Sequence, residues 1–425
     1  MTDNEEFEVV VVGGGPAGMT AAIALARLGF ATALATQPLP RGAKRDNRTA
    51  ALFTGSITLL RNLGVWDGVA AASAPISAIR ILDDTGALLK APEVVFTAAE
   101  VGLDVFGYNV PNAPLVDGLA EVAARTDLAI LETSAVSDVA VDAHGVTIGL
   151  AEGRRLRARL AVGADGRRSL CRQAAGITTQ TWTYDQSALT TSFSHQRPHA
   201  GVSTEFHRPS GPFTVVPLPG NASSLVWVER PAEAERLAGL DEAAFRASLE
   251  ERLQGLLGAV GEPTRRVAFP LSGLTAEVFA RNRVALVGEA GHVVPPIGAQ
   301  GLNLGLRDAA WLADSLTDAR RKGRDPGDDL ALARYTAARR LDVASRIWTI
   351  DILNKSLLSS LLPVHLARGL GLHALRALAP LRSIVVREGL APSGPTPRLM
   401  QADAGGSHLH PLAPPASAPP PEAAA

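Results

Sequence analysis

The segment that most constrains this chain lies near its start, where a buried strand runs into a glycine-rich turn and a helix. Four valines, Val9–Val12, form a short apolar run typical of a strand that is buried on both faces. The turn Gly13-Gly14-Gly15-Pro16-Ala17-Gly18 follows, and an alanine- and leucine-rich helix is expected to continue to about Leu28, before Gly29. This is G-x-G-x-x-G between a strand and a helix, the context that a dinucleotide phosphate site requires.

The residues of the turn have separate physical tasks. Gly13 permits the tight turn, Gly15 lets the backbone approach a pyrophosphate, and Gly18 allows the helix and strand to pack closely. Pro16 and Ala17 lie at the start of the helix, where free N–H groups and the positive end of the dipole attract phosphate. A glycine-rich turn without a ligand is the alternative interpretation of this motif.

The second expected strand lacks a residue that such sites usually carry. It spans about Ala31–Ala35, and an Asp or Glu normally follows it to bind the adenosine ribose. No acidic residue occurs between Glu8 and Asp46; Thr36 and Gln37 follow the strand instead. Their hydrogen bonds to a ribose would be weaker than those of a carboxylate. The turn alone therefore leaves both FAD and NAD(P) open.

Two later segments also place polar loops after apolar strands. Gly163-Ala164-Asp165-Gly166-Arg167-Arg168-Ser169 follows the strand Leu160–Val162. Leu286-Val287-Gly288-Glu289 ends a buried strand with a carboxylate that can accept hydrogen bonds from sugar or ribityl hydroxyls. The stretch from Pro295 to Gly301 begins with two prolines, which restrict the backbone, and continues with glycines, which allow it many conformations. Its backbone can therefore lie against a flat ring. Leu302-Asn303 then opens a helix whose N–H groups can meet negative charge.

Together the three segments resemble the fingerprints of the FAD-dependent aromatic-ring monooxygenases, the family of para-hydroxybenzoate hydroxylase. Further stretches are similar to its ubiquinone-biosynthesis ring hydroxylases, and the resemblance covers roughly residues 7–400; these stretches are Asp46–Leu52, Phe106–Leu119, Glu205–Gly220 and Arg339 to about Leu390. The resemblance implies FAD as cofactor and NAD(P)H as co-substrate. It also implies that O₂ hydroxylates the aromatic ring of a polyprenylated phenol in ubiquinone biosynthesis. Because the cofactor carries this chemistry, we expect no catalytic acid or base and no metal ligand from the chain.

The resemblance and the residue types together predict the cofactor contacts. Arg48 would reach the FAD phosphates or the ring face, and Asn112 would replace a basic residue that is Ala113 here. Glu289 stands where the family has Asp, which keeps the charge and adds a methylene group. For His292 a structural role is favoured over that of a base. The predicted contacts are Gly13, Gly15, Pro16, Ala17, Gly18, Thr36, Gln37, Arg48, Asn112, Val136, Asp165, Glu289, Pro295, Gly298, Ala299, Gln300, Gly301, Leu302 and Asn303.

The expected fold class is α/β, with a Rossmann-like FAD-binding domain, a second, mainly antiparallel substrate domain and C-terminal helices. Strand and helix signals alternate from Phe7 to about Ile177, and short alternating segments between Ala188 and Val228 suit an antiparallel sheet. One polar helix is expected at about Ala232–Leu257. The predicted boundaries are 1–75, 99–180 and 271–345 for the FAD-binding domain, 76–98 and 181–270 for the substrate hairpin and domain, 346–392 for the helices and 393–425 for a disordered tail.

Composition excludes several other classes of protein. Forty-one basic and forty-two acidic residues leave a net charge of −1, which argues against a nucleic-acid partner. The single cysteine, Cys171, excludes an intrachain disulfide, a C-x-x-C redox pair and a multi-cysteine zinc site. Acidic residues at the start of the chain favour a cytoplasmic protein over a secreted one.

A basic stretch near the C-terminus indicates a further contact. Residues 352–387 contain no Asp or Glu, but they contain five basic residues among recurring leucines. Such helices can lie peripherally on an anionic membrane, here the inner face of the cell membrane, and they can equally form dimer or core contacts. A homo-oligomer and a quinone-biosynthesis complex are both open. Two other functions also stay open: hydroxylation of a small soluble aromatic such as a hydroxybenzoate, and a non-oxygenating flavin-binding scaffold in such a complex.

Overall fold

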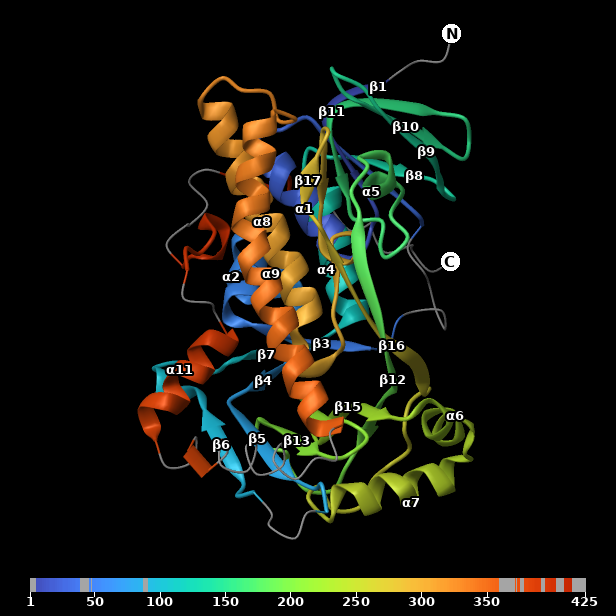
Figure 1. The fold of residues 1–425 in the computed structure, drawn as a ribbon, viewed down its shortest axis with the longest axis vertical. Coiled ribbons are helices and arrows are strands. Elements are labelled where there is room, and N and C mark those ends of the chain that lie inside the picture. The colour runs from blue at the N-terminus through green and yellow to red at the C-terminus, as the bar shows by residue number, and fades with distance from the viewer. Residues whose placement is uncertain are drawn as a thin grey trace, which may run out of the picture.

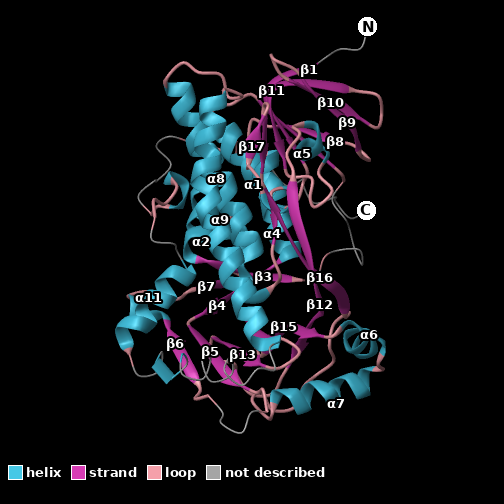
Figure 2. Ribbon diagram, in the orientation of Figure 1, coloured by secondary structure: helices cyan, strands magenta, loops and turns pink. Residues whose placement is uncertain are grey.

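Two large sheets lie toward opposite ends of an elongated molecule, and long helices run beside the first sheet (Figure 1). The computed structural model describes residues 5–38, 46, 48–86, 91–358, 371, 373–374, 378–390, 394–402 and 409–414. Two strands, β12 (Thr179–Ser194) and β16 (Val267–Ala276), run together between the two ends and pair antiparallel (Figure 2). Mixed parallel and antiparallel sheets with C-terminal helices confirm the predicted fold class. The exact domain boundaries stay a prediction.

The first sheet contains the parallel strands that the glycine-rich turn requires. Its order is β17-β18-β11-β1-β2-β8, and β9 and β10 extend it as an antiparallel hairpin from β11. The valines of β1 are fully or almost fully buried, as expected for a central strand. The strands are β1 (Glu5–Val12), β2 (Thr32–Thr36), β8 (Ala129–Glu132), β9 (Val136–Val141), β10 (Val146–Leu150), β11 (Arg155–Gly163), β17 (Ala280–Arg281) and β18 (Val284–Leu286).

Helices cover the first sheet and bury its apolar side chains. α1 packs against both α4 and α8, and α9 packs along α8. Together with β1 they enclose the largest cluster of buried apolar residues in the described chain. The helices on this side of the molecule are α1 (Pro16–Arg27), α2 (Thr54–Asn62), α3 (Trp66–Ala70), α4 (Asn112–Ala124), α5 (Leu170–Ala174), α8 (Gln300–Arg321) and α9 (Asp329–Leu358). A further helix, α11 (Ala379–Leu390), packs at the other end, where Val386 joins an apolar cluster with Ile76 and Phe96.

The second sheet is antiparallel except where β13 pairs with β5. Its order is β19-β16-β12-β15-β14-β13-β5-β6, and a small sheet, β3-β7-β4, lies beside it through contacts of β14 with β4 and β7. The remaining strands are β3 (Thr49–Phe53), β4 (Ala74–Ile76), β5 (Ala78–Asp83), β6 (Val94–Thr97), β7 (Gly107–Pro111), β13 (Val202–His207), β14 (Phe213–Leu218), β15 (Ala222–Glu229) and β19 (His292–Val293). Short 3-10 helices occur at η2 (Ala98–Val101), η3 (Gly288–Ala290), η4 (Ile297–Ala299) and η5 (Arg398–Met400).

The prediction of a single polar helix at about residues 232–257 is wrong. The structure has two helices there, α6 (Pro231–Gly239) and α7 (Glu242–Leu253), separated at Leu240 and Asp241. The break has a local cause, because the Asp241 carboxylate accepts a hydrogen bond from the Ala244 amide at 2.8 Å and so caps a new helix. Phe245 of α7 then reaches Trp227 in the core beneath the sheet.

The tail expected to be disordered from residue 393 is ordered in two described stretches. In residues 394–402, Arg398 pairs with Asp314 and Asp318 of α8 at 2.9 Å each. In residues 409–414, the His410 amide donates to the Arg27 carbonyl, and the Arg27 guanidinium donates back to the His410 carbonyl. Composition did not reveal these contacts, because a polar, proline-rich segment still becomes ordered where individual groups find partners on a packed surface.

Candidate active site

A first cavity, of about 530 Å³, opens where β1, β2 and β8 end. The parallel order places the carboxyl ends of these strands at one edge of the sheet, where open α/β folds bind their ligands. Thr36, the last residue of β2, and Gln37, which follows it, line this cavity, together with Thr133 and Ala135 from the loop after β8. The predicted contacts that line it are Gly13, Gly15, Thr36, Gln37, Val136 and Asp165.

The glycine-rich turn fits a pyrophosphate. A Cβ at Gly13 would lie 2.3 Å from the Ala164 carbonyl oxygen, and one at Gly18 would lie 2.0 Å from the Gly13 carbonyl oxygen, so both positions exclude side chains. At Gly15 nothing lies within 4 Å of such an atom, so the space above this residue is open. Gly15 is also the N-cap of α1, without a side-chain cap and without an acid in the first turn. The amide groups of α1 are therefore available to an anion.

A second cavity, of about 710 Å³, adjoins the first at Gly15 and Ala164. It lies between the start of α1, the loop after β18 and one face of the second sheet, which contributes residues of β12, β15 and β16. The cavity therefore joins the nucleotide turn to a separate sheet. The predicted contacts that line it are Gly15, Pro16, Ala17, Gly18, Arg48, Asn112, Glu289, Gly301 and Leu302.

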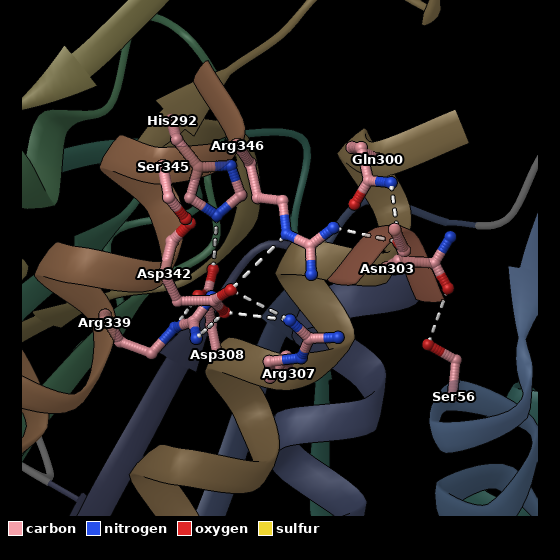
Figure 3. Close-up of polar contacts among 11 residues, drawn as sticks. Ser56, His292, Gln300, Asn303, Arg307, Asp308, Arg339, Asp342, Ser345 and Arg346 are labelled. Atoms are coloured by element: carbon pink, nitrogen blue, oxygen red, sulfur yellow. Dashed lines mark hydrogen bonds and ion pairs between the residues drawn. The ribbon is translucent and has the colours of Figure 1, made fainter. Parts of the chain in front are cut away.

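Five predicted contacts line neither cavity: Pro295, Gly298, Ala299, Gln300 and Asn303. Pro296, the next residue along the chain, borders the second cavity in place of Pro295. The Asn303 side chain accepts a hydrogen bond from the Ser56 hydroxyl at 2.8 Å (Figure 3). It also accepts one from the Phe53 amide at 3.0 Å. It thus ties α8 to β3 and α2, and it shapes the cavity through the backbone.

Asp46 completes a polar group at the edge of the second cavity that sequence reasoning missed. Its carboxylate accepts hydrogen bonds from Arg48 Nη2 and from Asn112 Nδ2, each at 2.8 Å. Burial by itself would raise the pKa of Asp46, but the hydrogen bonds from Arg48 and Asn112 outweigh it and lower the pKa to about 2. The only sequence signal was an acid two residues before Arg48. The charge of Arg48 is therefore compensated within the protein.

Glu289 lies on the wall of the second cavity and pairs with the middle motif. Its carboxylate is 3.2 Å from Arg167 Nε, and Arg167 also donates to the Ser272 hydroxyl at 3.1 Å. Both charged side chains are about half exposed. Arg167 belongs to the segment Gly163–Ser169, but it was not among the predicted contacts. Its partner lies 122 residues away in the chain, and the sequence does not show such a pairing.

A buried carboxylate, Asp308, holds the segment that follows β18. It lies 2.7 Å from His292 Nε2 and pairs with Arg339 Nε at 2.6 Å (Figure 3). It also accepts a hydrogen bond from the Gly288 amide at 2.9 Å. Burial would raise the pKa of Asp308, but the charges of His292 and Arg339 outweigh it, so the pKa lies below its ordinary value. His292 borders the cavity with its ring held by this hydrogen bond to Asp308, which fits a structural role.

Known proteins with similar sequences identify the family of this chain. The sequence pattern of a family described as "FAD binding domain" matches residues 6–349. The chain belongs to the FAD binding domain family. Its relatives include ubiquinone hydroxylase UbiL of Rhodospirillum rubrum, 37% identical over 93% of this chain and 92% of the relative. They also include 3-demethoxyubiquinol 3-hydroxylase of Escherichia coli, 32% identical over 91% of this chain and 99% of the relative.

Solved structures agree with this assignment at the level of the fold. The p-nitrophenol 4-monooxygenase PnpA of Pseudomonas putida has a TM-score of 0.73 at 23% identity, covering 92% of this chain and all of that one. The family match and the relatives confirm the resemblance stated from the sequence, and FAD as the cofactor. Within the described residues, no group of three or more His, Cys, Asp or Glu is placed to hold a metal ion.

Gly15→Ala tests the phosphate cradle. Gly15 has φ −71° and open space around it, so alanine fits the apoprotein but occupies the place of the phosphate. We expect roughly tenfold weaker FAD binding, measured by flavin fluorescence, with the melting temperature of the apoprotein unchanged. Gly239→Ala, at the end of α6 with equally open space, is the matched control. Equal FAD affinity for both variants would contradict the assignment.

Asp308→Asn tests the buried ion pairs. The change removes one of the two carboxylate partners of the buried Arg339 and leaves Asp342 as the other, so the free energy of unfolding should fall by about 3 kcal/mol. Because the pKa of Asp308 is depressed in the folded protein, its contribution exists above the unfolded pKa and disappears as the pH falls through the folded pKa. The difference from the wild type, measured by denaturant unfolding, should therefore be largest near neutral pH and shrink on acidification. Asp138→Asn, from the exposed pair with Arg155, should change little at any pH.

Proposed function

We propose that this protein uses NAD(P)H and O₂ to hydroxylate the aromatic ring of a polyprenylated phenol in ubiquinone biosynthesis. The observation that carries the proposal is the second cavity, which joins the nucleotide turn to a sheet able to hold an aromatic ring. Relatives named for ubiquinone hydroxylation, at 37% and 32% identity over nearly the whole chain, support this substrate class.

The chain's own residues would bind and orient the reactants. FAD, when bound, supplies electron transfer from NAD(P)H and the activation of O₂. The start of α1 above Gly15 would hold the pyrophosphate, and Glu289 would accept hydrogen bonds from the ribityl hydroxyls. The backbone at Pro296, Gly301 and Leu302 would lie beside the flavin ring, with the first amides of α8 close to its polar edge.

The face of the second sheet is suited to a phenol. Leu225, Val226 and Phe269 give the cavity an apolar wall, which excludes water from a reacting ring. Hydroxyl side chains stand among these residues, and Ser224 is held by hydrogen bonds from Asn109 and Thr49 at 3.0 Å each. Two cations, Arg48 and Arg265, line the same cavity, and Arg48 is already paired with Asp46.

A turnover assay with isotopic oxygen tests this function. Purified protein with FAD should oxidise NAD(P)H faster when a polyprenylated phenol is present, and mass spectrometry should find one ¹⁸O atom from ¹⁸O₂ in the product. Hydroxybenzoate is the matched soluble substrate, and preferential labelling of it would favour the small-aromatic alternative. Bound flavin without stimulated oxidation for either compound would favour a scaffold.

We also propose that the protein contacts the membrane peripherally near α11. Much of the basic stretch at 352–387 lies outside the described residues, but Lys355, Arg382 and Arg387 lie within them. Exposed aliphatic side chains accompany these cations, including Ile384 at 58% exposure and Val385 at 44%. Arg382 is paired with Glu100, so the apolar side chains carry most of this argument. Within the described part of the chain, no helix combines the length and apolarity needed to cross a bilayer.

Liposome sedimentation tests the membrane contact. Ile384→Glu combined with Val385→Glu should reduce binding to anionic vesicles at physiological salt several-fold, since it removes apolar area and adds negative charge. Leu330→Glu is the control, because Leu330, near the start of α9, is as exposed as Ile384 and lies outside α11. Equal sedimentation of the double variant and the wild type would contradict the contact and favour a dimer or core role for this surface.

A further inference from the structure

The first cavity lacks the acid that usually binds the adenosine ribose, and Gln37 occupies the corresponding edge. Its side-chain amide has one donor group and one acceptor oxygen, so its usefulness to a ribose depends on which of them faces the cavity. Gln37 Nε2 donates to the carbonyl oxygen of Ser134 at 2.8 Å. This hydrogen bond uses one of the two N–H groups of Nε2 and fixes the amide, which leaves Oε1 as an acceptor for ribose hydroxyls.

The loop that carries the Ser134 carbonyl is itself held in place by the carboxylate of Glu152. Glu152, in the turn between β10 and β11, accepts the Ser134 amide at 2.8 Å, the Ser134 hydroxyl at 2.9 Å and the Thr133 hydroxyl at 2.6 Å. The Thr133 amide in turn donates to the Thr36 carbonyl at 2.9 Å, which ties the loop to the end of β2. Thr133 and Gln37 both line the first cavity.

We propose that Glu152 is a positioning residue for the adenosine half of FAD. It fixes the loop of Thr133 and Ser134, the loop orients the Gln37 amide, and Gln37 Oε1 accepts hydrogen bonds from the ribose in place of the missing carboxylate. The Ser134 amide and the Thr133 hydroxyl lower the pKa of Glu152 to about 2, so it stays ionised throughout the neutral range. The proposal rests on FAD as the cofactor and is independent of which substrate is hydroxylated.

The test compares Glu152→Gln with Glu132→Gln in the full-length apoprotein. Glutamine at 152 cannot accept all three hydrogen bonds, so the FAD dissociation constant should rise by roughly tenfold. Glu132 ends β8 beside the same loop but accepts none of these bonds, and its variant should bind FAD like the wild type. Flavin fluorescence quenching gives these constants without any turnover, so failure of the hydroxylase proposal would not affect them.

Two further readouts separate positioning from a general loss of structure. Binding of FMN, which lacks the adenosine, should be the same for wild type and Glu152→Gln. In a double-mutant cycle, Gln37→Ala should remove most of the effect of Glu152→Gln, because Glu152 acts through Gln37. An unchanged FAD constant in Glu152→Gln, an equal loss of FMN binding, or additive effects in the cycle would each overturn the proposal.

Discussion

Much of the active-site geometry depends on Asp308, a carboxylate with no solvent contact. A buried charge is tolerated only when several partners compensate the loss of hydration, and Asp308 has three: His292, the Gly288 amide and Arg339. These partners come from the segment after β18 and from α9, while Asp308 itself lies on α8. One group thus fixes the position of the motif that carries Glu289 relative to two long helices. Arg339 extends the arrangement to Asp342, which also pairs with Arg307.

The uncharged residues at the adenosine side of the first cavity depend on their neighbours in the same way. Thr36 and Gln37 carry no charge, so their orientation must come from neighbours rather than from electrostatic attraction to a ligand. The loop after β8 provides that orientation, and Glu152 gives the loop its rigidity. At the edge of the second cavity, Asp46 plays a similar part for Arg48 and Asn112. In both places a carboxylate acts through the groups that it aligns.

Local features were predictable because neighbouring residues determine them. The strand, turn and helix at Val9–Leu28 match β1 and α1 closely, since glycine geometry and apolar periodicity act within a few residues. The error at residues 232–257 also has a local cause, a capping aspartate inside a continuous polar pattern. Asn303 was correctly placed at the start of α8, but its side chain serves β3 and α2, which sequence spacing does not show.

The sequence by itself determined that the chain has a nucleotide turn with glycines at 13, 15 and 18, and it indicated the flavin family from three motifs in combination. Only the tertiary structure decided which residues surround the second cavity, because Ser224 and Phe269 come from strands that register places beside the turn. It also decided that Arg167 meets Glu289 and that Glu152 meets Ser134. Such contacts join segments far apart in the chain, and their energies depend on distance in space, which no pattern along the sequence contains.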